Sequence, residues 1–101
     1  MDGSHIKKMT VIFHILSNPN RLQVLYLCLE EPISVGDLVD TLKLSQSLVS
    51  HHLKQLREAN LIQATRQGKN MIYQVTDKRV QCVLKDMLSH INAPIKKRQK
   101  K

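Results

Sequence analysis

The chain has 101 residues and a formal net charge of +8, a length that fits one domain. No apolar run reaches the roughly 18 residues that span a membrane, and we expect no secretion signal at its start. Two cysteines outside any C-x-x-C arrangement do not form a disulfide framework, so a reducing cytoplasm is the expected location. These totals predict one small domain with no membrane partner.

The positive charge is concentrated in two segments. Residues 41–79 contain seven basic and two acidic residues, and residues 94–101 contain five basic residues and no acidic one. Residues 1–40 contain three basic and five acidic residues. This distribution favours a polyanion bound at a defined place. A solvated basic face without a ligand would give the same counts, so that alternative stays open.

Helical spacing of apolar residues predicts a first helix over residues 5–16 and a second over residues 19–31, which Pro32 ends. Asn18 is a suitable N-cap for the second helix. This helix is apolar on several sides, so it should lie centrally in the fold. Residues 1–5 show little structural pattern, which leaves open whether they belong to the native chain.

Two shorter helices follow. Ser34 can cap a helix over residues 35–42, and Ser45 can cap another that runs to about Glu58. Two helices joined by a turn of three or four residues match the helix-turn-helix arrangement. The strings IQATR and MIYQV then flank QGKN, in which Gly68 can adopt the positive φ of a tight hairpin. We expect a two-stranded ribbon with a basic tip.

Asp77 can cap a last helix that is apolar on one face and that Pro94 closes. The basic string 94–101 should be a disordered tail. The order of elements is α-α-α-α-β-β-α, mainly α with a small β-hairpin. The sequence therefore predicts one winged helix-turn-helix domain over residues 1–93.

The helix that follows Ser45 carries a distinctive set of polar side chains. At about 100° per residue, Val49, Leu53 and Leu56 share one side, which should face the core. The opposite side carries short polar side chains and no acidic residue before Glu58. Such a helix can lie deep in a DNA major groove, where its side chains offer donors and acceptors to base edges. We predict base contacts from Gln46, Ser47, Ser50 and His51.

Basic residues on the helix are predicted to contact DNA phosphates, which position a protein without reading sequence. Residues at the hairpin are predicted to reach the DNA backbone or the minor groove. The candidates are Lys54 and Arg57 on the helix, Arg66 and Lys69 at the hairpin, and Asn70 as a further one. Each could equally be an ordinary exposed polar residue. His52 is expected at the flank of the helix or in the core.

Three strings resemble the ArsR/SmtB family of bacterial winged-helix repressors: LSNPNRLQVL, LSQSLVSHHLKQLREANLI and RQGKNMIYQV. The resemblance covers about residues 9–93, and the middle string is the most specific. It implies a homodimer, joined through the first and last helices, that binds a palindromic operator and releases it when an effector binds. The apolar faces of those two helices are consistent with such a dimer interface, because so small a core cannot cover them. Two recognition helices would meet successive major grooves about 34 Å apart.

The metal sites of the family are incomplete in this chain. Where the thiolate site has Cys-Val-Cys-Asp-Leu, residues 34–38 read Ser-Val-Gly-Asp-Leu. At the zinc site of the last helix the aligned residues are Asp77, Arg79, His90 and Ala93, and neither arginine nor alanine can serve as a ligand. We expect no metal and no cofactor, with Asp77 acting as an N-cap. Arg79 could form an ion pair across the dimer, for example with the partner's Asp77.

Two other sensing arrangements stay open. Cys28 and Cys82 lie on the helices that carry redox cysteines in some family members, but at displaced positions. Cys82 should face outward, whereas Cys28 should be a small buried hydrophobe. A disulfide, or modification of Cys82 alone, would make a thiol-controlled regulator. His5 and His14 could also join His90 in an alternative metal site.

Other function classes fit less well. The sequence has no nucleophile elbow, no paired carboxylates and no phosphate-binding glycine loop, so catalysis is not expected. A winged helix that binds RNA or protein is the rival class. RNA readers usually offer exposed aromatic side chains for stacking, whereas packing explains Phe13, Tyr26 and Tyr73. The predicted partner is therefore double-stranded DNA.

Overall fold

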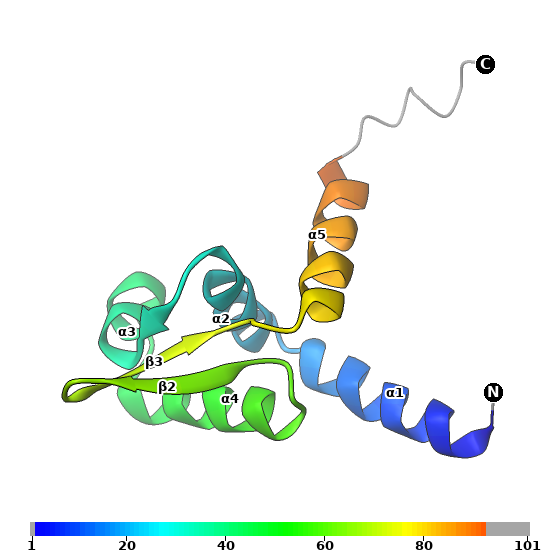
Figure 1. The fold of residues 1–101 in the computed structure, drawn as a ribbon, viewed down its shortest axis with the longest axis horizontal. Helices are drawn as coiled ribbons and strands as arrows, with labels where there is room; N and C mark the ends of the chain where they lie inside the picture. Colours follow the sequence, from blue (N-terminus) through cyan, green and yellow to red (C-terminus); the bar gives the residue numbers. More distant parts are fainter. Residues whose placement is uncertain (1, 93–101) are drawn as a thin grey trace.

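The computed structural model describes residues 2–92, which form five helices and three strands (Figure 1). In chain order they are α1 (Gly3–Leu16), α2 (Pro19–Glu30), β1 (Ile33–Ser34), α3 (Val35–Leu42), α4 (Gln46–Glu58), β2 (Gln63–Gln67), β3 (Asn70–Gln74) and α5 (Lys78–Asn92). The predicted winged helix-turn-helix architecture is confirmed. The basic tail predicted over residues 94–101 lies outside the described residues, as does Ala93.

Side-chain oxygens begin α2, α3 and α4, as the sequence predicts. Asn18 Oδ1 accepts the backbone N–H of Arg21 at 3.0 Å. Ser34 Oγ and Ser45 Oγ each accept the N–H three residues later at 3.1 Å. These caps satisfy N–H groups that have no partner within the helix. Lys43, with a left-handed φ of 59°, ends α3 and turns the chain towards α4.

The first helix begins earlier than the apolar spacing predicts. Asp2 Oδ1 accepts the backbone N–H of Ser4 at 3.0 Å and that of His5 at 3.1 Å, so Asp2 is the N-cap of α1. For residues 2–5 the expectation of little structural pattern is therefore wrong. Apolar periodicity could not show this, because it begins only at Ile6.

An apolar core lies between α2, α3, α4 and the sheet. Its largest fully buried side chains are Leu25, Leu38, Leu53, Leu56, Val24, Val49 and Cys28. Helix α2 contributes three of them, which confirms its predicted central position. Val49, Leu53 and Leu56 confirm the predicted core side of α4, because each is at most 2% exposed. Their burial fixes the rotation of α4, and the opposite side must face solvent.

A third strand, not predicted from the sequence, extends the hairpin. Strands β2 and β3 pair antiparallel, and β1 pairs with the other edge of β3, with Ser34 opposite Ile72. Two residues are too few for β1 to show an alternating pattern. Gly68 has the positive φ, +62°, that was predicted at the hairpin tip. We call residues 63–74 the wing.

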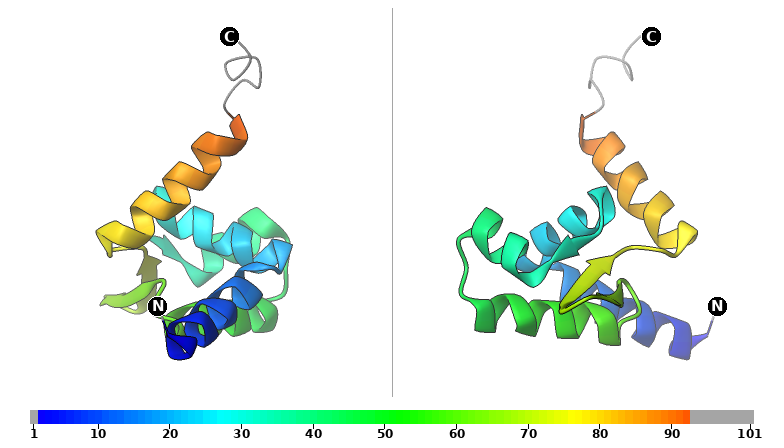
Figure 2. Two further views of the ribbon diagram at one scale, coloured as in Figure 1. Left: turned by 90° about the vertical axis from the view of Figure 1, so that its right-hand side faces the viewer. Right: turned by 60° about the vertical axis from the view of Figure 1, so that its left-hand side comes forward.

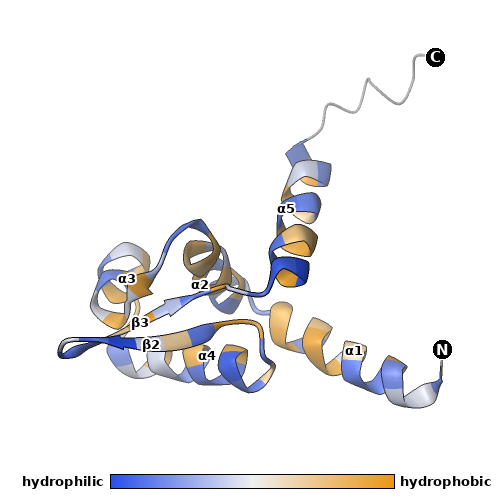
Figure 3. Ribbon diagram, viewed as in Figure 1, coloured by the Kyte–Doolittle hydropathy of each residue, from blue (hydrophilic) through white to orange (hydrophobic). Residues whose placement is uncertain are grey.

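Helices α1 and α5 extend away from the core in different directions (Figures 1 and 2). Their exposed large apolar side chains are Ile6, Met9, Val11 and Phe13 on α1, and Val83, Met87, Leu88 and Ile91 on α5. Figure 3 shows apolar residues along both helices. Exposed apolar side chains gathered on two protruding helices mark an interaction surface. Among the described residues, no helix is long and apolar enough to cross a membrane.

Candidate nucleic-acid interface

The side of α4 opposite the core carries the predicted base-reading residues. Gln46, Ser47, Ser50 and His51 are all exposed, and we call this set the polar stripe. Its side chains are short or planar, so they do not keep the helix axis away from a surface that it approaches. Lys54 and Arg57, further along α4, are also exposed. Helix α4 therefore offers hydrogen-bonding groups along one side, followed by positive charge.

The wing adds two positive charges near its tip. Arg66 and Lys69 are exposed, and they flank the turn around Gly68. Asn70, also exposed, pairs with Gln67 where the hairpin closes. Long cationic side chains at a hairpin tip can reach phosphate groups on a neighbouring strand of nucleic acid.

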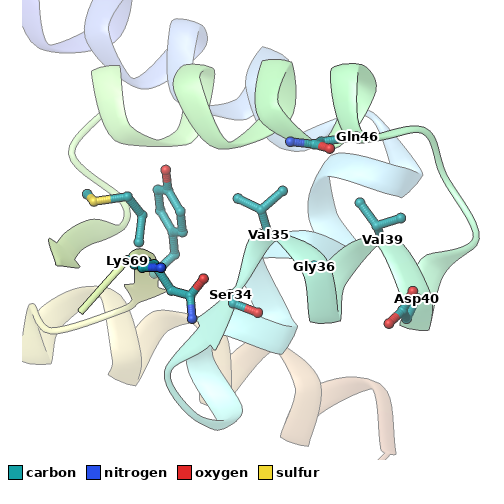
Figure 4. A pocket seen from close by; sticks show the side chains of 10 residues that line it. Ser34, Val35, Gly36, Val39, Asp40, Gln46 and Lys69 are labelled. Carbon is teal, nitrogen blue, oxygen red and sulfur yellow. The ribbon is translucent and has the colours of Figure 1, made fainter. Parts of the chain in front are cut away.

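A hollow of about 440 Å³ lies between the wing, α3 and the first turn of α4 (Figure 4). Gln46 borders it from the first turn of α4, and Lys69 borders it from the wing. Val35 and Val39 of α3 form part of its wall, and Asp40 is its acidic lining residue. The hollow brings the start of the polar stripe and the wing tip to a common depression. The structure thus places residues from α4 and the wing around one surface feature.

His52 lies in the core, as expected, and not on the polar stripe. Its side chain is 2% exposed, and its Nδ1 accepts a hydrogen bond from Arg21 Nε at 3.3 Å. Burial lowers the pKa of His52, and the neighbouring charges of Arg21 and His51 lower it further. Arg21 was not singled out in the sequence as a functional residue. A signal was present, because Arg21 is the one charged residue between Pro19 and Leu29 in a helix that is otherwise largely apolar.

Asp77, the carboxylate that remains of the family's zinc site, already accepts hydrogen bonds from its own chain. Asp77 Oδ1 accepts the backbone N–H of Arg79 at 2.8 Å, which confirms the predicted N-cap of α5. The Arg79 guanidinium also holds Asp77 Oδ2 at 2.8 Å, and these bonds lower the pKa of Asp77 to about 2. In this single chain Arg79 thus bonds the carboxylate of its own Asp77, and the ion pair with the partner's Asp77 stays a prediction. Sequence spacing could not decide between the two.

The other candidate ligands are dispersed. Within residues 2–92 no three His, Cys, Asp or Glu side chains are grouped so that they could hold a metal ion. His90 is exposed near the end of α5, and His5 lies beside Asp2 at 3.1 Å. On α3, where the thiolate site would lie, Ser34 Oγ is used as the helix cap.

The two cysteines lie in opposite environments. Cys28 is 1% exposed, and burial raises the pKa of its thiol to about 12. A thiol with this pKa is rarely a thiolate and is therefore a poor nucleophile. Cys82 is exposed, and both thiols are free. The predicted orientations are confirmed, and they do not favour the disulfide hypothesis.

Comparison with known proteins identifies the family. A family model described as "Bacterial regulatory protein, arsR family" matches residues 18–64. The transcriptional repressor SmtB homolog of Synechocystis sp. is 31% identical over 91 residues, 90% of this chain and 69% of the relative. The transcriptional activator HlyU of Vibrio cholerae is 32% identical over 77 residues, 76% of this chain and 71% of the relative. The chain belongs to the ArsR family.

Solved structures agree with this assignment. The crystal structure of NolR from Sinorhizobium fredii superposes with a TM-score of 0.78 at 30% identity, covering 88% of each chain. HlyU from Vibrio cholerae superposes with a TM-score of 0.79 at 28% identity, covering 90% of this chain and 98% of the other. Family members are transcriptional regulators. This ArsR-family protein is therefore a DNA-binding transcriptional regulator with the exposed α4 surface described above.

Proposed function

We propose that this regulator binds an inverted-repeat operator as a homodimer, with one α4 in each of two successive major grooves. The observation that carries the proposal is the exposed polar stripe, which contains no acidic residue and lies opposite a fully buried side of the same helix. A B-DNA major groove admits one α-helix. Short side chains allow the helix to approach base edges closely.

This surface makes two kinds of contact with DNA, to base edges and to phosphates. Gln46, Ser47, Ser50 and His51 contact base edges, where amide, hydroxyl and imidazole groups can both donate and accept. Lys54, Arg57, Arg66 and Lys69 contact phosphates and so fix the position of the protein on the duplex. Asn70 is a further candidate at the wing.

The dimer forms through α1 and α5. Both helices expose large apolar side chains, such as Phe13 at 64% and Ile91 at 68% exposure. Burying such side chains against a second copy is favourable, at roughly 25 cal/mol per Å² of apolar surface removed from water. A protein that binds chromosomal DNA works in the cytoplasm of a prokaryotic cell.

We do not propose that the protein senses a metal at the α3 thiolate site or at the α5 zinc site. The α3 position has no cysteine, and Arg79 occupies the one carboxylate of the α5 site that this chain retains. Repression is the direction that the SmtB relatives suggest, although HlyU is named an activator. Blocking of a promoter by the bound dimer is the simplest mechanism.

A pair of matched substitutions tests the proposal. Gln46→Glu adds one negative charge to the polar stripe, at the first residue of α4, where the helix dipole favours an acid and folding should not suffer. Gln23→Glu makes the same chemical change on the exposed surface of α2. DNA is supplied as the inverted repeat that the wild-type protein enriches from a random duplex pool, with hairpin RNA as the competitor.

We expect Gln46→Glu to abolish binding of the enriched duplex, because a carboxylate in the groove repels phosphate. Gln23→Glu should bind like the wild-type protein. Equal binding by both variants, or a wild-type preference for the RNA hairpin, would overturn the proposal.

A further inference from the structure

Arg21 connects three helices through its side chain and backbone. It lies in the first turn of α2, half-buried, with its backbone N–H bound to Asn18. Its guanidinium Nη1 donates to the carbonyl oxygen of Ile15 in α1 at 2.9 Å. Its Nε donates to His52 Nδ1 in α4 at 3.3 Å. One side chain thus bonds both the helix that leaves the core and the helix that carries the polar stripe.

The Ile15 carbonyl oxygen and His52 Nδ1 both have Arg21 as their hydrogen-bond donor. The last four carbonyls of a helix have no partner within it, and a cation at a helix C-terminus is favoured by the helix dipole. The Ile15 carbonyl is one of these groups, one residue before the end of α1. His52 Nδ1 can accept only while it carries no proton, so the ring proton lies on Nε2. That Nε2 is buried and has no partner among the described residues.

Helix α1 has few other attachments to the core. Ile12, Ile15 and Leu16 of its second half pack against the core, whereas its first half is exposed. It contains 14 residues, a length of about 21 Å at 1.5 Å per residue. A tilt of about 10° at the Arg21 end would move the far end of α1 by about 3.6 Å, close to the roughly 3.4 Å between successive base pairs.

We infer that Arg21 is a positioning residue that fixes the angle between α1 and α4, and so the spacing of half-sites that the dimer accepts. The inference rests on the proposed function, because α1 must form part of the dimer interface for its angle to separate the two α4 helices. The angle between α1 and α4 then determines how far apart the two polar stripes of the dimer lie. The hydrogen bond from Arg21 to His52 fixes the position of α4, because His52 and the polar stripe belong to this same helix.

The test uses Arg21→Lys together with a pair of His52 variants. Lysine keeps the charge but has one nitrogen, which cannot serve both Ile15 and His52 in the wild-type geometry. His52→Asn keeps an acceptor near the position of Nδ1, and His52→Leu removes it. Each variant is titrated with a series of duplexes in which the enriched half-sites are moved apart or together one base pair at a time.

We expect wild-type protein and His52→Asn to prefer one spacer sharply. Arg21→Lys and His52→Leu should lower the ratio of affinities between this spacer and its neighbours by about fivefold or more, the lower end of ordinary coupling between sites. A purely stabilising role would lower the melting temperature and weaken all duplexes alike, with the ratio unchanged. An unchanged ratio in both Arg21→Lys and His52→Leu would overturn the inference.

A second readout does not use DNA. Spin labels on Glu58→Cys, in a Cys82→Ser background, report the distance between the two α4 helices by pulsed EPR. We expect a narrow distribution with Arg21 and a broad one with Arg21→Lys. If the wild-type protein bound no duplex but the distribution still broadened, the proposed function would fail and the positioning role would stand. Absence of any distance between protomers would overturn the inference.

Discussion

Replacing Lys69 by Gln at the wing tip should make DNA binding less sensitive to salt. The proposed function assigns four exposed basic residues of each protomer to phosphate contacts: Lys54, Arg57, Arg66 and Lys69. If each contacts one phosphate, a homodimer makes about eight contacts, and the plot of log affinity against log salt has a slope of about −7. Lys69→Gln removes one contact from each protomer. The slope should therefore become shallower by about 1.8.

Fluorescence anisotropy of a labelled duplex, repeated over a range of salt concentrations, measures this slope. Lys85→Gln provides the matched control, because Lys85 is an exposed lysine on α5, far along the chain from the wing. Both variants lose one charge per protomer, so a general effect of net charge would change both slopes equally. A slope that is unchanged by Lys69→Gln, or changed as much by Lys85→Gln, would refute the assignment of the wing to the DNA backbone.

Further predictions concern single side chains. His51→Ala should cost about 1–3 kcal/mol of binding free energy for the enriched duplex and little for unrelated DNA, as measured by competition. Zinc should change operator affinity by less than about fivefold, because Arg79 holds Asp77; a larger effect that His90→Ala abolishes would contradict this. The pKa of His52 is lowered in the fold, so the free energy of unfolding should fall as pH drops below about 6.5, by at most about 1.4 kcal/mol per pH unit. Denaturant titrations should show this fall in the wild-type protein and in His90→Gln, but not in His52→Leu.

Most of the fold and the surface of α4 could be predicted because local rules decide them. The spacing of Val49, Leu53 and Leu56 fixes which side of α4 is buried, so the exposure of the opposite side follows from geometry. Asn18 and Ser45 precede their helices at the positions where an oxygen satisfies free N–H groups. Such signals lie within a few residues of the structure that they specify.

Contacts between distant residues, and choices between equivalent partners, could not be predicted. Arg21 and His52 are separated by 31 positions, and no periodicity relates them. Spacing alone does not say which acid Arg79 bonds, and its contact with Asp77 depends on the path of the chain just before α5. Strand β1 forms because β3 offers a free edge, and its two residues carry no pattern of their own.

Cleavage of DNA from α4 itself would show whether two copies of this helix occupy successive major grooves. An iron chelate attached to Glu58→Cys, at the end of α4 and outside the polar stripe, in a Cys82→Ser background, cuts the nearest DNA backbone. The same chelate on Glu31→Cys, an exposed residue just after α2, serves as the control. We predict two clusters of cuts on the enriched duplex, one in each half-site, because the recognition helices lie one helical turn apart. A single cluster, or a cleavage pattern shared with the Glu31→Cys chelate, would mean that the two α4 helices do not lie in successive major grooves.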